Sequence, residues 1–406
     1  MKPNQATKNM KKAIIVIPTY NESKNVGPVT EKLQEVFKKI KNWKMEILIV
    51  DDTSPDKTYD VVKELQKKQK NLHLVINKKK AGLGGAYLRG FKEAYGPLGA
   101  DVAFEFDADL SHDPTKIPQF LKMIDEGYDM VLGSRYIKGG GIPDDWGIDR
   151  KFMSVVGNLV IMTVLTDFRI RDWTGGYRAI TKEVYEDVHK NLTSERFSGY
   201  TFQIGSLHQA VRKGYKVGEV PFQFVDRTEG ESKLGGEYVK NTLIYIFKVR
   251  LEEIMKSRFF KFLFVGGLGT IIQLVSLSIL RALLPDFNFL FLTKFLTATL
   301  IAIELAIASN FVLNNLWTFA DKKLDPKKIP NKFLQFNLAS MGSVIIQFIV
   351  NLLGENLIGL KPLFKLPVIN FMIDTGLIFA MTGIIIGLFW NFFAYNKFIW
   401  NSKKKK

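Results

Sequence analysis

Cysteine is absent from the 406 residues of this chain, and its absence excludes disulfide bonds and thiolate chemistry. We also expect no signal peptide. Residues 1–12 are polar and basic, and the apolar run at 13–18 is too short to form the core of one. We therefore expect the first domain to stay in the cytoplasm. The lack of cysteine does not by itself assign a compartment.

Acidic residues are in the minority. The chain has 40 aspartates and glutamates against 57 lysines and arginines, so its formal charge is +17. Many lysines stand in short runs beside apolar segments, at 322–323, 327–328 and 403–406. Basic residues gather on the cytoplasmic side of membrane proteins and attract anionic lipid headgroups. This pattern favours a lipid bilayer over nucleic acid as the partner, and a merely solvated tail is the alternative.

A mean hydropathy near zero hides a division of the chain into two parts. Up to about residue 256 the sequence reads as a soluble protein, in which short β-branched runs alternate with segments of helical apolar spacing. The runs lie at 13–17, 47–50, 72–76, 102–106 and 130–132. This alternation predicts a parallel α/β sheet. Ligands of such sheets bind beyond the carboxyl ends of the strands, so the residues that follow each strand are the first candidates for a binding site.

From residue 259 onward the chain has four apolar segments, each at or near the length of about 20 residues that spans hydrocarbon. They lie at about 260–284, 291–317, 333–353 and 371–398. The motif Lys-Phe-Leu opens both pairs of segments, at 261 and 332, and Asn-Phe recurs near the end of both, at 310 and 391. We expect a four-helix transmembrane domain over 259–406, made of two two-helix repeats, with its C-terminus in the cytoplasm.

Between these parts, residues 235–258 carry apolar side chains near one helical face and polar or charged side chains on another. This spacing predicts interfacial amphipathic helices that lie on the membrane surface. A helix packed on the soluble domain, residues 1–234, would show the same periodicity.

A pair of carboxylates follows the run at 102–106. In Asp107-Ala108-Asp109 the side chains diverge along an extended strand and converge where the backbone turns at the strand end. Magnesium and manganese take a few carboxylate oxygens and complete their shells with water and substrate phosphate, so the pair suits an ion that bridges a diphosphate. A solvated turn has the same spacing, but the position after a sheet strand favours a metal site.

Two further strand ends carry acids. Residues 18–22 follow the first run, and Asp51 and Asp52 follow the second. A carboxylate at the second strand end is suited to a ribose or a base edge, and Tyr20 offers an aromatic face to a base. Turn and helix-cap roles are the alternative for each residue. The glycines of 82–85 would let the backbone approach a ligand, although a glycine loop alone is a weak indication.

Together these motifs resemble glycosyltransferase family 2, and within it dolichyl-phosphate mannose synthases and bacterial polyprenyl-phosphate glycosyltransferases. The resemblance covers most of residues 13–234. It rests on Ile-Pro-Thr-Tyr-Asn-Glu at 17–22, Val-Asp-Asp-Thr-Ser-Pro-Asp at 50–56, Gly-Leu-Gly at 82–84, Asp-Ala-Asp-Leu-Ser-His at 107–112 and Gly-Ser-Arg-Tyr at 133–136. Residues 309–311 and 315–319 are similar to the GtrA-like membrane domain that is sometimes fused to such enzymes.

This resemblance implies a catalytic domain with the GT-A fold, an α/β Rossmann-like fold that binds a donor nucleotide-sugar. The donor-binding positions would be Pro18, Tyr20, Glu22, Val50, Asp52, Asp107, Ala108, Asp109, Arg227 and Lys233. Asp107, Asp109 and Ser111 would hold Mg²⁺ or Mn²⁺, with Ser111 standing where the family often has glutamine. Asp109 and Arg135 would be the catalytic residues.

A lipid phosphate acceptor requires cations, because it must be held beside a diphosphate of the same sign. Arg135, Arg150, Arg227 and Lys233 are the candidates, and arginine suits contact with phosphate through two hydrogen bonds. Ser154, on the same helical face as Arg150, would add a hydroxyl. Solvated surface cations are the alternative.

A phosphate monoester is largely ionised near neutral pH, with a second pKa of about 6, so no catalytic base is needed. We expect a turn or packing role for His112, and inversion at the sugar from direct displacement.

We therefore expect transfer of mannose from GDP-mannose to dolichyl or another polyisoprenyl phosphate, giving a lipid sugar for glycan assembly. The protein would be a multi-pass membrane protein, with a prokaryotic or archaeal plasma membrane favoured over the endoplasmic reticulum. A UDP-glucose-dependent transferase is the nearest alternative, because the motifs indicate binding of phosphate and ribose but do not identify the base or the sugar of the donor.

Two other classes of function remain. A processive polysaccharide synthase is disfavoured, since the Gln-x-x-Arg-Trp motif of that branch lacks its tryptophan at 209–213. The membrane part would be a lipid flippase if Lys294, Glu304 and Asp374 were working charges. A simple anchor, with these charges paired or near helix ends, is the alternative.

Overall fold

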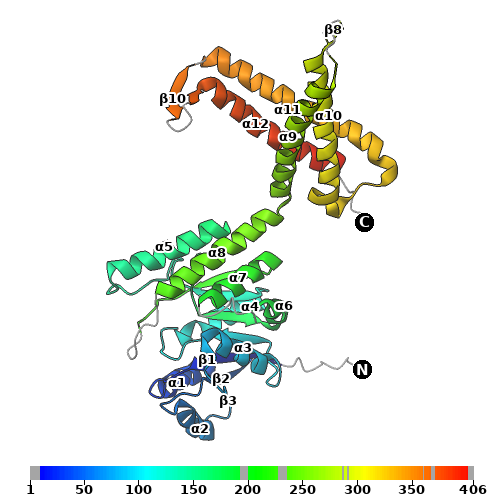
Figure 1. The fold of residues 1–406 in the computed structure, drawn as a ribbon. Coiled ribbons are helices and arrows are strands. Elements are labelled where there is room, and N and C mark those ends of the chain that lie inside the picture. Colours follow the sequence, from blue (N-terminus) through cyan, green and yellow to red (C-terminus); the bar gives the residue numbers. More distant parts are fainter. Residues whose placement is uncertain are drawn as a thin grey trace, which may run out of the picture. The chain divides into compact units, whose positions relative to one another are not determined.

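In the computed structural model the chain folds into two units, Met1–Arg250 and Leu251–Lys406 (Figure 1). The structure describes residues 10–192, 200–226, 236–285, 288–289, 292–359, 361–366 and 371–400.

A seven-stranded sheet forms the centre of the first unit, in the order β3-β2-β1-β4-β6-β5-β7. The strands are β1 Lys11–Thr19, β2 Trp43–Asp51, β3 Leu72–Ile76, β4 Val102–Glu105, β5 Met130–Ser134, β6 Arg178–Thr181 and β7 Val217–Pro221. β1 pairs in parallel with β2 and β4, β2 with β3, and β5 with β7. The expected Rossmann-like α/β fold is confirmed.

The expectation of a wholly parallel sheet is wrong in one strand. β6 pairs antiparallel with both β4 and β5. It was missed because only Ile180 of its four residues is both β-branched and apolar. Arg178 stands directly opposite Glu105 of β4.

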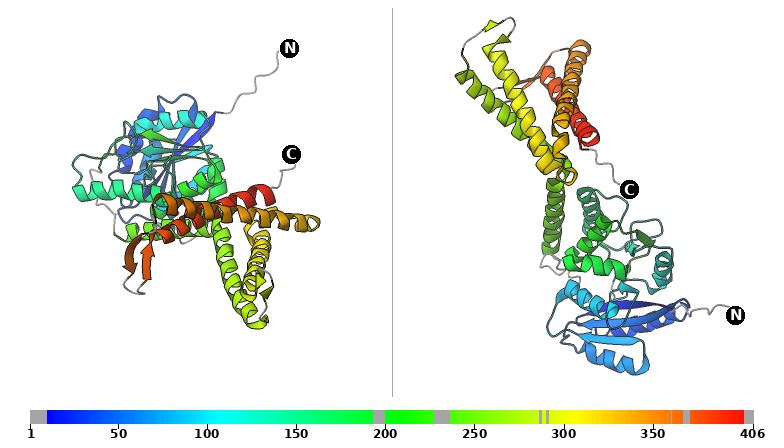
Figure 2. Two further views of the ribbon diagram at one scale, coloured as in Figure 1. Left: turned by 90° about the horizontal axis from the view of Figure 1, so that it is seen from above. Right: turned by 90° about the vertical axis from the view of Figure 1, so that its right-hand side faces the viewer.

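Helices lie on both faces of this sheet (Figures 1 and 2). They are α1 Val26–Phe37, α2 Thr58–Lys68, α3 Gly82–Tyr95, α4 Ile117–Asp125, α5 Ile148–Leu165, α6 Lys182–Leu192, α7 Tyr200–Lys213 and α8 Gly236–Lys256. Alternate residues of β1 enter different cores, with Ile15 and Ile17 on one side and Ile14 and Val16 on the other. Burial on both faces explains why the run at 13–17 is continuously apolar.

Helix α8 falls in the segment predicted to be amphipathic. Ile246 is fully buried in a core of the first unit. Ile244, Phe247 and Leu251 are each more than half exposed. The helix therefore packs on the first unit along one side and presents apolar side chains on another, and its last residues belong to the second unit.

The second unit contains two helix pairs, which Figure 2 shows as separate hairpins. They are α9 Arg258–Leu283 with α10 Lys294–Leu313, and α11 Ile329–Leu357 with α12 Thr375–Ala394. A short antiparallel ribbon connects each pair, β8 Asn288–Phe289 with β9 Leu292–Thr293 and β10 Pro362–Leu366 with β11 Phe371–Asp374. The second helix of each pair runs into a π-helical turn, Asn314–Thr318 and Tyr395–Ile399. The same order of elements thus occurs twice, in agreement with the repeated sequence motifs.

Measured over the residues that the structure describes, no helix combines the length and apolar character that crossing a membrane requires.

The three charges considered for transport are only partly visible. Glu304 accepts a hydrogen bond from Asn337 Nδ2 at 3.1 Å. The side chains of Lys294 and Asp374 lie outside the described part of the chain.

Candidate active site

The carboxyl ends of β1, β2 and β4 bring the predicted motifs to one edge of the sheet. Pro18 and Thr19, at the end of β1, are in register with Val50 and Asp51 of β2. β4 pairs with the other side of β1. The amide N–H of Asp52 donates to the carbonyl of Thr19 at 3.0 Å, so the first two acidic strand ends are directly joined. This is the edge at which open α/β sheets bind ligands.

Asp51 builds the turn after β2. Its fully buried carboxylate accepts hydrogen bonds from Thr19 Oγ1 at 3.0 Å and from the amide and hydroxyl of Ser54 at 2.8 and 2.6 Å. The Ser54 hydroxyl in turn accepts from the amide of Asn21 at 3.1 Å. Asn21 has a φ of 60°, in the left-handed region that asparagine tolerates better than most residues. The carboxylate of Asp51 and the hydroxyl of Ser54 therefore help to hold the loops after β1 and β2 together.

Asp52 ties β2 to the glycine loop. Its carboxylate is 4 % exposed and accepts from Asn77 Nδ2 at 2.6 Å and from the amides of Ala81 and Gly82 at 3.0 and 2.9 Å. Gly82 has a φ of +74°, where a side chain would be strained, and it begins α3. The predicted donor-binding aspartate thus fixes the loop that lies next to the site.

The other residues predicted to contact the donor nucleotide-sugar differ in how exposed their side chains are. Tyr20 is half-buried, and Lys80 Nζ lies 3.6 Å from the centre of its ring, a cation–π contact. Glu22, also half-buried, accepts a hydrogen bond from Asn25 Nδ2 at 2.7 Å. Val50 is fully buried in the core.

The Asp107-Ala108-Asp109 motif forms a tight turn after β4. Asp109 Oδ1 accepts from the amide of Ser111 at 3.0 Å, and Leu110 between them has a φ of 60°. A leucine in this region is uncommon and costs backbone energy. Ala108 and Ser111 are buried, whereas the side chain of Asp107 is 38 % exposed. The chain turns at this point, directly after the strand.

His112 is a buried residue that packs against the start of this turn. It is 3 % exposed, stacks on Tyr177 with ring centres 4.9 Å apart, and contacts Phe106 edge-on. The amide of Asp107 donates to His112 Nδ1 at 3.1 Å, so the ring proton is on Nε2, which lies 3.7 Å from Asp107 Oδ2. Burial lowers the pKa of His112, and it stays neutral at physiological pH. The expected turn and packing role therefore agrees with the structure.

Tyr87 of α3 is a second support for Asp107. Its hydroxyl donates to Asp107 Oδ1 at 3.3 Å. Burial, followed by the charge of Asp107, raises the pKa of Tyr87 well above its usual value, so the phenol remains a donor.

The donor set fits a divalent cation that shares its shell with substrate. Among the described residues there is no group of three or more histidine, aspartate or glutamate side chains placed to hold a metal ion. An ion held by Asp107 and Asp109 would therefore take further ligands from water and a diphosphate, which is the usual way in which magnesium binds beside phosphates.

Arg135 follows β5 and is bound to a buried carboxylate. Its Nε and Nη2 donate to the two oxygens of Asp172 at 2.7 and 2.8 Å, and Nη2 also donates to Thr174 Oγ1 at 2.7 Å. Burial works against ionisation of Asp172, but Arg135 outweighs it and holds the pKa of this carboxyl below its usual value. The charges of Asp109, Arg135 and Asp172 all act on His112, so this ion pair shares one neighbourhood with the acidic turn.

Arg150 of α5 forms a second, more open ion pair. Its guanidinium donates to both oxygens of Asp226 at 3.0 Å and stacks over Trp146 at 3.7 Å. Arg150 and Asp226 are each 37 % exposed. Ser154, one turn further along α5, forms a short hydrogen bond with the hydroxyl of Tyr136. The predicted acceptor residues are thus grouped, although both arginines are paired with carboxylates.

Two of the sequence predictions cannot be placed, and three contributors were missed. Arg227 and Lys233 lie outside the described residues. Asp172 and Tyr87 were not predicted, because neither directly follows a β-branched run, and Asp226, at the start of the loop that contains Arg227, was given no role. The sole hint was that Asp172 precedes Thr-Gly-Gly, a turn-forming stretch before β6.

Comparison with known proteins places this site in a family. Residues 14–188 match the model of glycosyl transferase family 2, and residues 261–400 match the GtrA/DPMS transmembrane domain. A dolichol-phosphate mannosyltransferase of Pyrococcus furiosus is 35 % identical over 349 residues, which cover 84 % of this chain and 89 % of that protein. A polyprenol monophosphomannose synthase of Mycolicibacterium smegmatis is 35 % identical over 250 residues, covering 61 % of this chain and 87 % of that protein.

A solved structure of glucosyl-3-phosphoglycerate synthase from Mycobacterium tuberculosis is more distant. It is 16 % identical, covers 58 % of this chain and 78 % of its own, and has a TM-score of 0.44, which is too low to carry any role across. The long match to the archaeal relative and the two family models agree with the acidic turn at the carboxyl edge of the sheet. The chain belongs to glycosyl transferase family 2 and is a glycosyltransferase with a C-terminal domain of the GtrA/DPMS transmembrane type.

Proposed function

We propose that this chain transfers mannose from GDP-mannose to dolichyl phosphate or another polyprenyl phosphate. The observation that carries the proposal is the turn of Asp107 and Asp109, which shares its neighbourhood with the ion pair of Arg135 and Asp172. Acidic and basic groups side by side suit a reaction that brings a nucleoside diphosphate and a phosphate acceptor together. The names of the two relatives, both mannosyl transferring and both using a polyprenol, support the choice of sugar and acceptor.

The donor would be held by the acidic edge of the sheet. Asp107 and Asp109 would bind Mg²⁺ or Mn²⁺, which supplies charge stabilisation to the departing diphosphate. His112 and Tyr87 would keep Asp107 in place, because both reach its carboxylate from buried positions. Asp52 would position the glycine loop at 81–82 against the nucleotide.

The acceptor would be held by arginine. Arg150 is the better candidate for direct contact, since its pair with Asp226 is partly exposed and a phosphate would compete for the same two hydrogen bonds. Arg135 is held by a fully buried carboxylate and would contribute fixed positive charge. The acceptor oxygen attacks the anomeric carbon as the bond from that carbon to the diphosphate breaks, with inversion and without a base.

The surface of α5 supports a lipid acceptor. Ile148, Phe152, Val155 and Leu159 recur at helical spacing and are 88, 62, 48 and 51 % exposed. Arg150 lies on the same helix. An exposed apolar stripe of this kind is typical of a helix that lies in a membrane interface, where a polyprenyl chain would be available.

We also infer a membrane location with the catalytic unit and the C-terminus on the cytoplasmic side. The match to the GtrA/DPMS transmembrane domain and the lysine runs beside apolar segments support this orientation. A prokaryotic or archaeal plasma membrane would meet these requirements.

The test is transfer of labelled sugar to dolichyl phosphate in detergent, from GDP-mannose, UDP-glucose or UDP-N-acetylglucosamine, with and without manganese. We expect a mannolipid from GDP-mannose alone, dependent on metal and lost in Asp109→Ala. Asp60→Ala is the matched control, because Asp60 is exposed on α2 and pairs with Lys63 alone among the contacts described. A glucolipid would change the donor and keep the mechanism. Folded protein that makes no lipid product from any donor would refute the proposal.

A further inference from the structure

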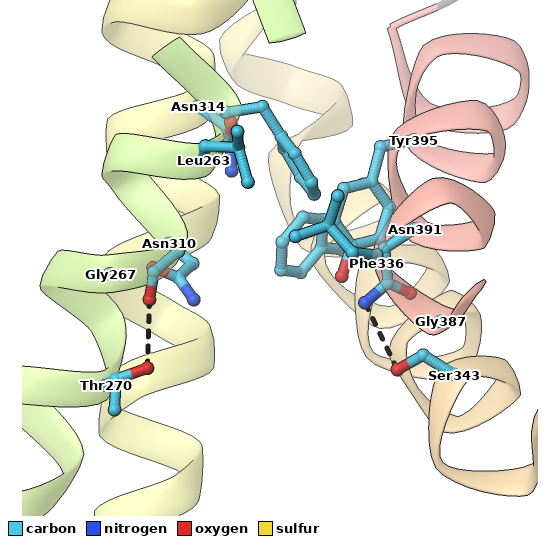
Figure 3. A pocket seen from close by; sticks show the side chains of 13 residues that line it. Leu263, Gly267, Thr270, Asn310, Asn314, Phe336, Ser343, Gly387, Asn391 and Tyr395 are labelled. Atoms are coloured by element: carbon cyan, nitrogen blue, oxygen red, sulfur yellow. Dashed lines mark hydrogen bonds between the residues drawn. The ribbon is translucent and has the colours of Figure 1, made fainter. Parts of the chain in front are cut away.

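A cavity of about 320 Å³ lies within the second unit, lined by all four of its long helices (Figure 3). This volume falls in the range of about 300–1,000 Å³ that is usual for small-molecule sites. Leu263, Gly267 and Thr270 of α9 face it from one hairpin, and Ser343 of α11 from the other.

Three amide side chains around this cavity have unsatisfied oxygens. Within the described part of the chain, the side-chain oxygens of Asn310, Asn314 and Asn391 are buried and accept no hydrogen bond. Asn314 is 1 % exposed. Nearly all buried polar groups in proteins have a partner, so three buried amide oxygens without a donor around one cavity indicate that a ligand supplies the missing donors.

Two of these amides, Asn310 and Asn391, occupy corresponding positions in the two repeats. Asn310 lies one turn before the π-helical turn that ends the first hairpin, and Asn391 lies one turn before the one that ends the second. Breaks from regular α-helix at such places are frequent at functional sites. Binding sites at the interface of structural repeats are also the rule in membrane transport proteins.

The residues that line the cavity indicate which kind of ligand it would bind. No lysine, arginine, histidine or carboxylate lines the cavity among the described residues. A phosphate would therefore be bound without a counter-charge, which is unfavourable in a buried site. An amide offers both a donor and an acceptor, and a hydroxyl group matches both. Phe262, Phe336 and Leu388 add apolar surface. The cavity suits a neutral group that carries several hydroxyls.

We propose that this cavity binds the hexosyl headgroup of the lipid product, separately from the site in which the sugar is transferred. The inference rests on the proposed function for the source of the headgroup. It gives the second unit a role in accepting the product, beyond that of an anchor.

The lack of cysteine makes a direct test available. In Gly267→Cys the new side chain would point into open space, because a Cβ there meets nothing within 4 Å, and this residue lines the cavity. Gly27→Cys on α1 of the first unit also has open space and is the control. The full chain carrying Asp109→Ala, which prevents turnover, is placed in nanodiscs, and the rate of modification by a small methanethiosulfonate is measured. The probes are a short polyprenyl phosphate that bears mannose and the same polyprenyl phosphate without the sugar.

The mannosylated probe at about ten times its Kd should slow modification at position 267 about tenfold. The unglycosylated probe should have little effect, and neither should act at position 27. Asn310→Leu combined with Asn391→Leu should remove the protection while leaving the rate without lipid unchanged, which shows that the unit is still folded.

Each contrary result has a distinct meaning. Equal protection by both probes would overturn the selectivity for sugar. No modification at position 267, or no protection by the mannosylated probe, would overturn the site itself. Because the probes are synthetic, these outcomes do not depend on catalysis. Failure of the proposed function would instead be seen as absence of mannolipid synthesis by the wild-type chain.

Discussion

At the scale of single residues, the acidic side chains at the carboxyl edge of the sheet have two roles. Some of them hold the loops in place, and others face the expected ligand. Asp52 connects β2 to Asn77 and to the amides of Ala81 and Gly82, so its effect on the donor would be exerted through the loop. Hydrogen bonds of this kind, between a carboxylate and amide N–H groups, contribute about 1.5–3 kcal/mol each.

Asp52→Asn should therefore lower both stability and donor affinity. The amide is uncharged and accepts at one end only, so the charge-assisted hydrogen bonds from Asn77 and from the amides of Ala81 and Gly82 are weakened or lost, at a cost of about 1–3 kcal/mol in the free energy of unfolding. We expect a lower melting temperature and a higher KM for the nucleotide-sugar, measured on the same preparation. Asp60→Asn on exposed α2 serves as control. A raised KM with unchanged stability would show that Asp52 acts on the nucleotide directly.

Beneath the acidic turn lies a buried ion pair that takes no part in the proposed chemistry. Glu105 and Arg178 are both fully buried, with Arg178 Nε 3.8 Å from Glu105 Oε2. Arg178 also donates to the carbonyl oxygens of Gly175, Gln203 and Trp173. Burial raises the pKa of Glu105 to about 7, although the charge of Arg178 opposes the rise.

This shift predicts how stability depends on pH. The usual pKa of the carboxyl is 4.5, so between pH 4.5 and about 7 the folded chain keeps a proton that the unfolded chain has lost. The contribution of Glu105 to stability is therefore complete below pH 4.5 and is lost as pH rises through about 7. Glu105→Gln should flatten this part of the profile of melting temperature against pH. Glu64→Gln, at an exposed position of α2, should not. Identical profiles for Glu105→Gln and wild type would contradict the assignment.

At the scale of elements, α5 combines a recognition residue with an exposed apolar stripe. Arg150 lies between Ile148 and Phe152, whose side chains are among the most exposed apolar groups of the first unit. This arrangement would not stabilise a purely soluble protein, because apolar surface contributes to stability only when it is removed from water. A membrane surface would cover the stripe and bring the lipid acceptor to Arg150.

Phe152→Ser combined with Leu159→Ser should lower transfer to a long-chain acceptor in vesicles. Burial of each apolar side chain in the interface is worth about 1.5 kcal/mol at the low end, or roughly tenfold in binding. Transfer to a short, water-soluble polyprenyl phosphate and the melting temperature should be unchanged, since both residues are exposed. Ile76→Ser, at an exposed position of β3, is the matched control. An equal loss with the short acceptor would mean that α5 acts on catalysis and not on the membrane.

At the scale of the whole molecule, the charge of +17 predicts a preference for anionic lipid. Transfer in vesicles that contain an anionic phospholipid should be faster than in vesicles of neutral lipid. The advantage should fade as salt rises from about 0.05 M to about 0.5 M, because the Debye length then shortens to a few ångströms. The neutral vesicles provide the control at each salt concentration. An advantage that persists at high salt would point to a specific lipid site in place of a surface potential.

The sequence by itself determined the features that depend on local pattern. The apolar runs indicated five of the strands, the acidic turn after β4 was recognisable from its residues, and the repeated Lys-Phe-Leu and Asn-Phe motifs indicated the two hairpins of the second unit. These features are local because the period of apolar residues sets the type of element, and motifs at strand ends share an edge in any parallel arrangement.

The tertiary structure decided which distant side chains meet. Arg135 and Arg150 were expected at a phosphate, yet each is bound to a carboxylate far along the chain, Asp172 and Asp226. The antiparallel direction of β6 and the cavity between the hairpins were likewise not visible in the sequence. Such contacts depend on how helices and strands pack in three dimensions, and the spacing of residues along one element carries no information about its partner on another.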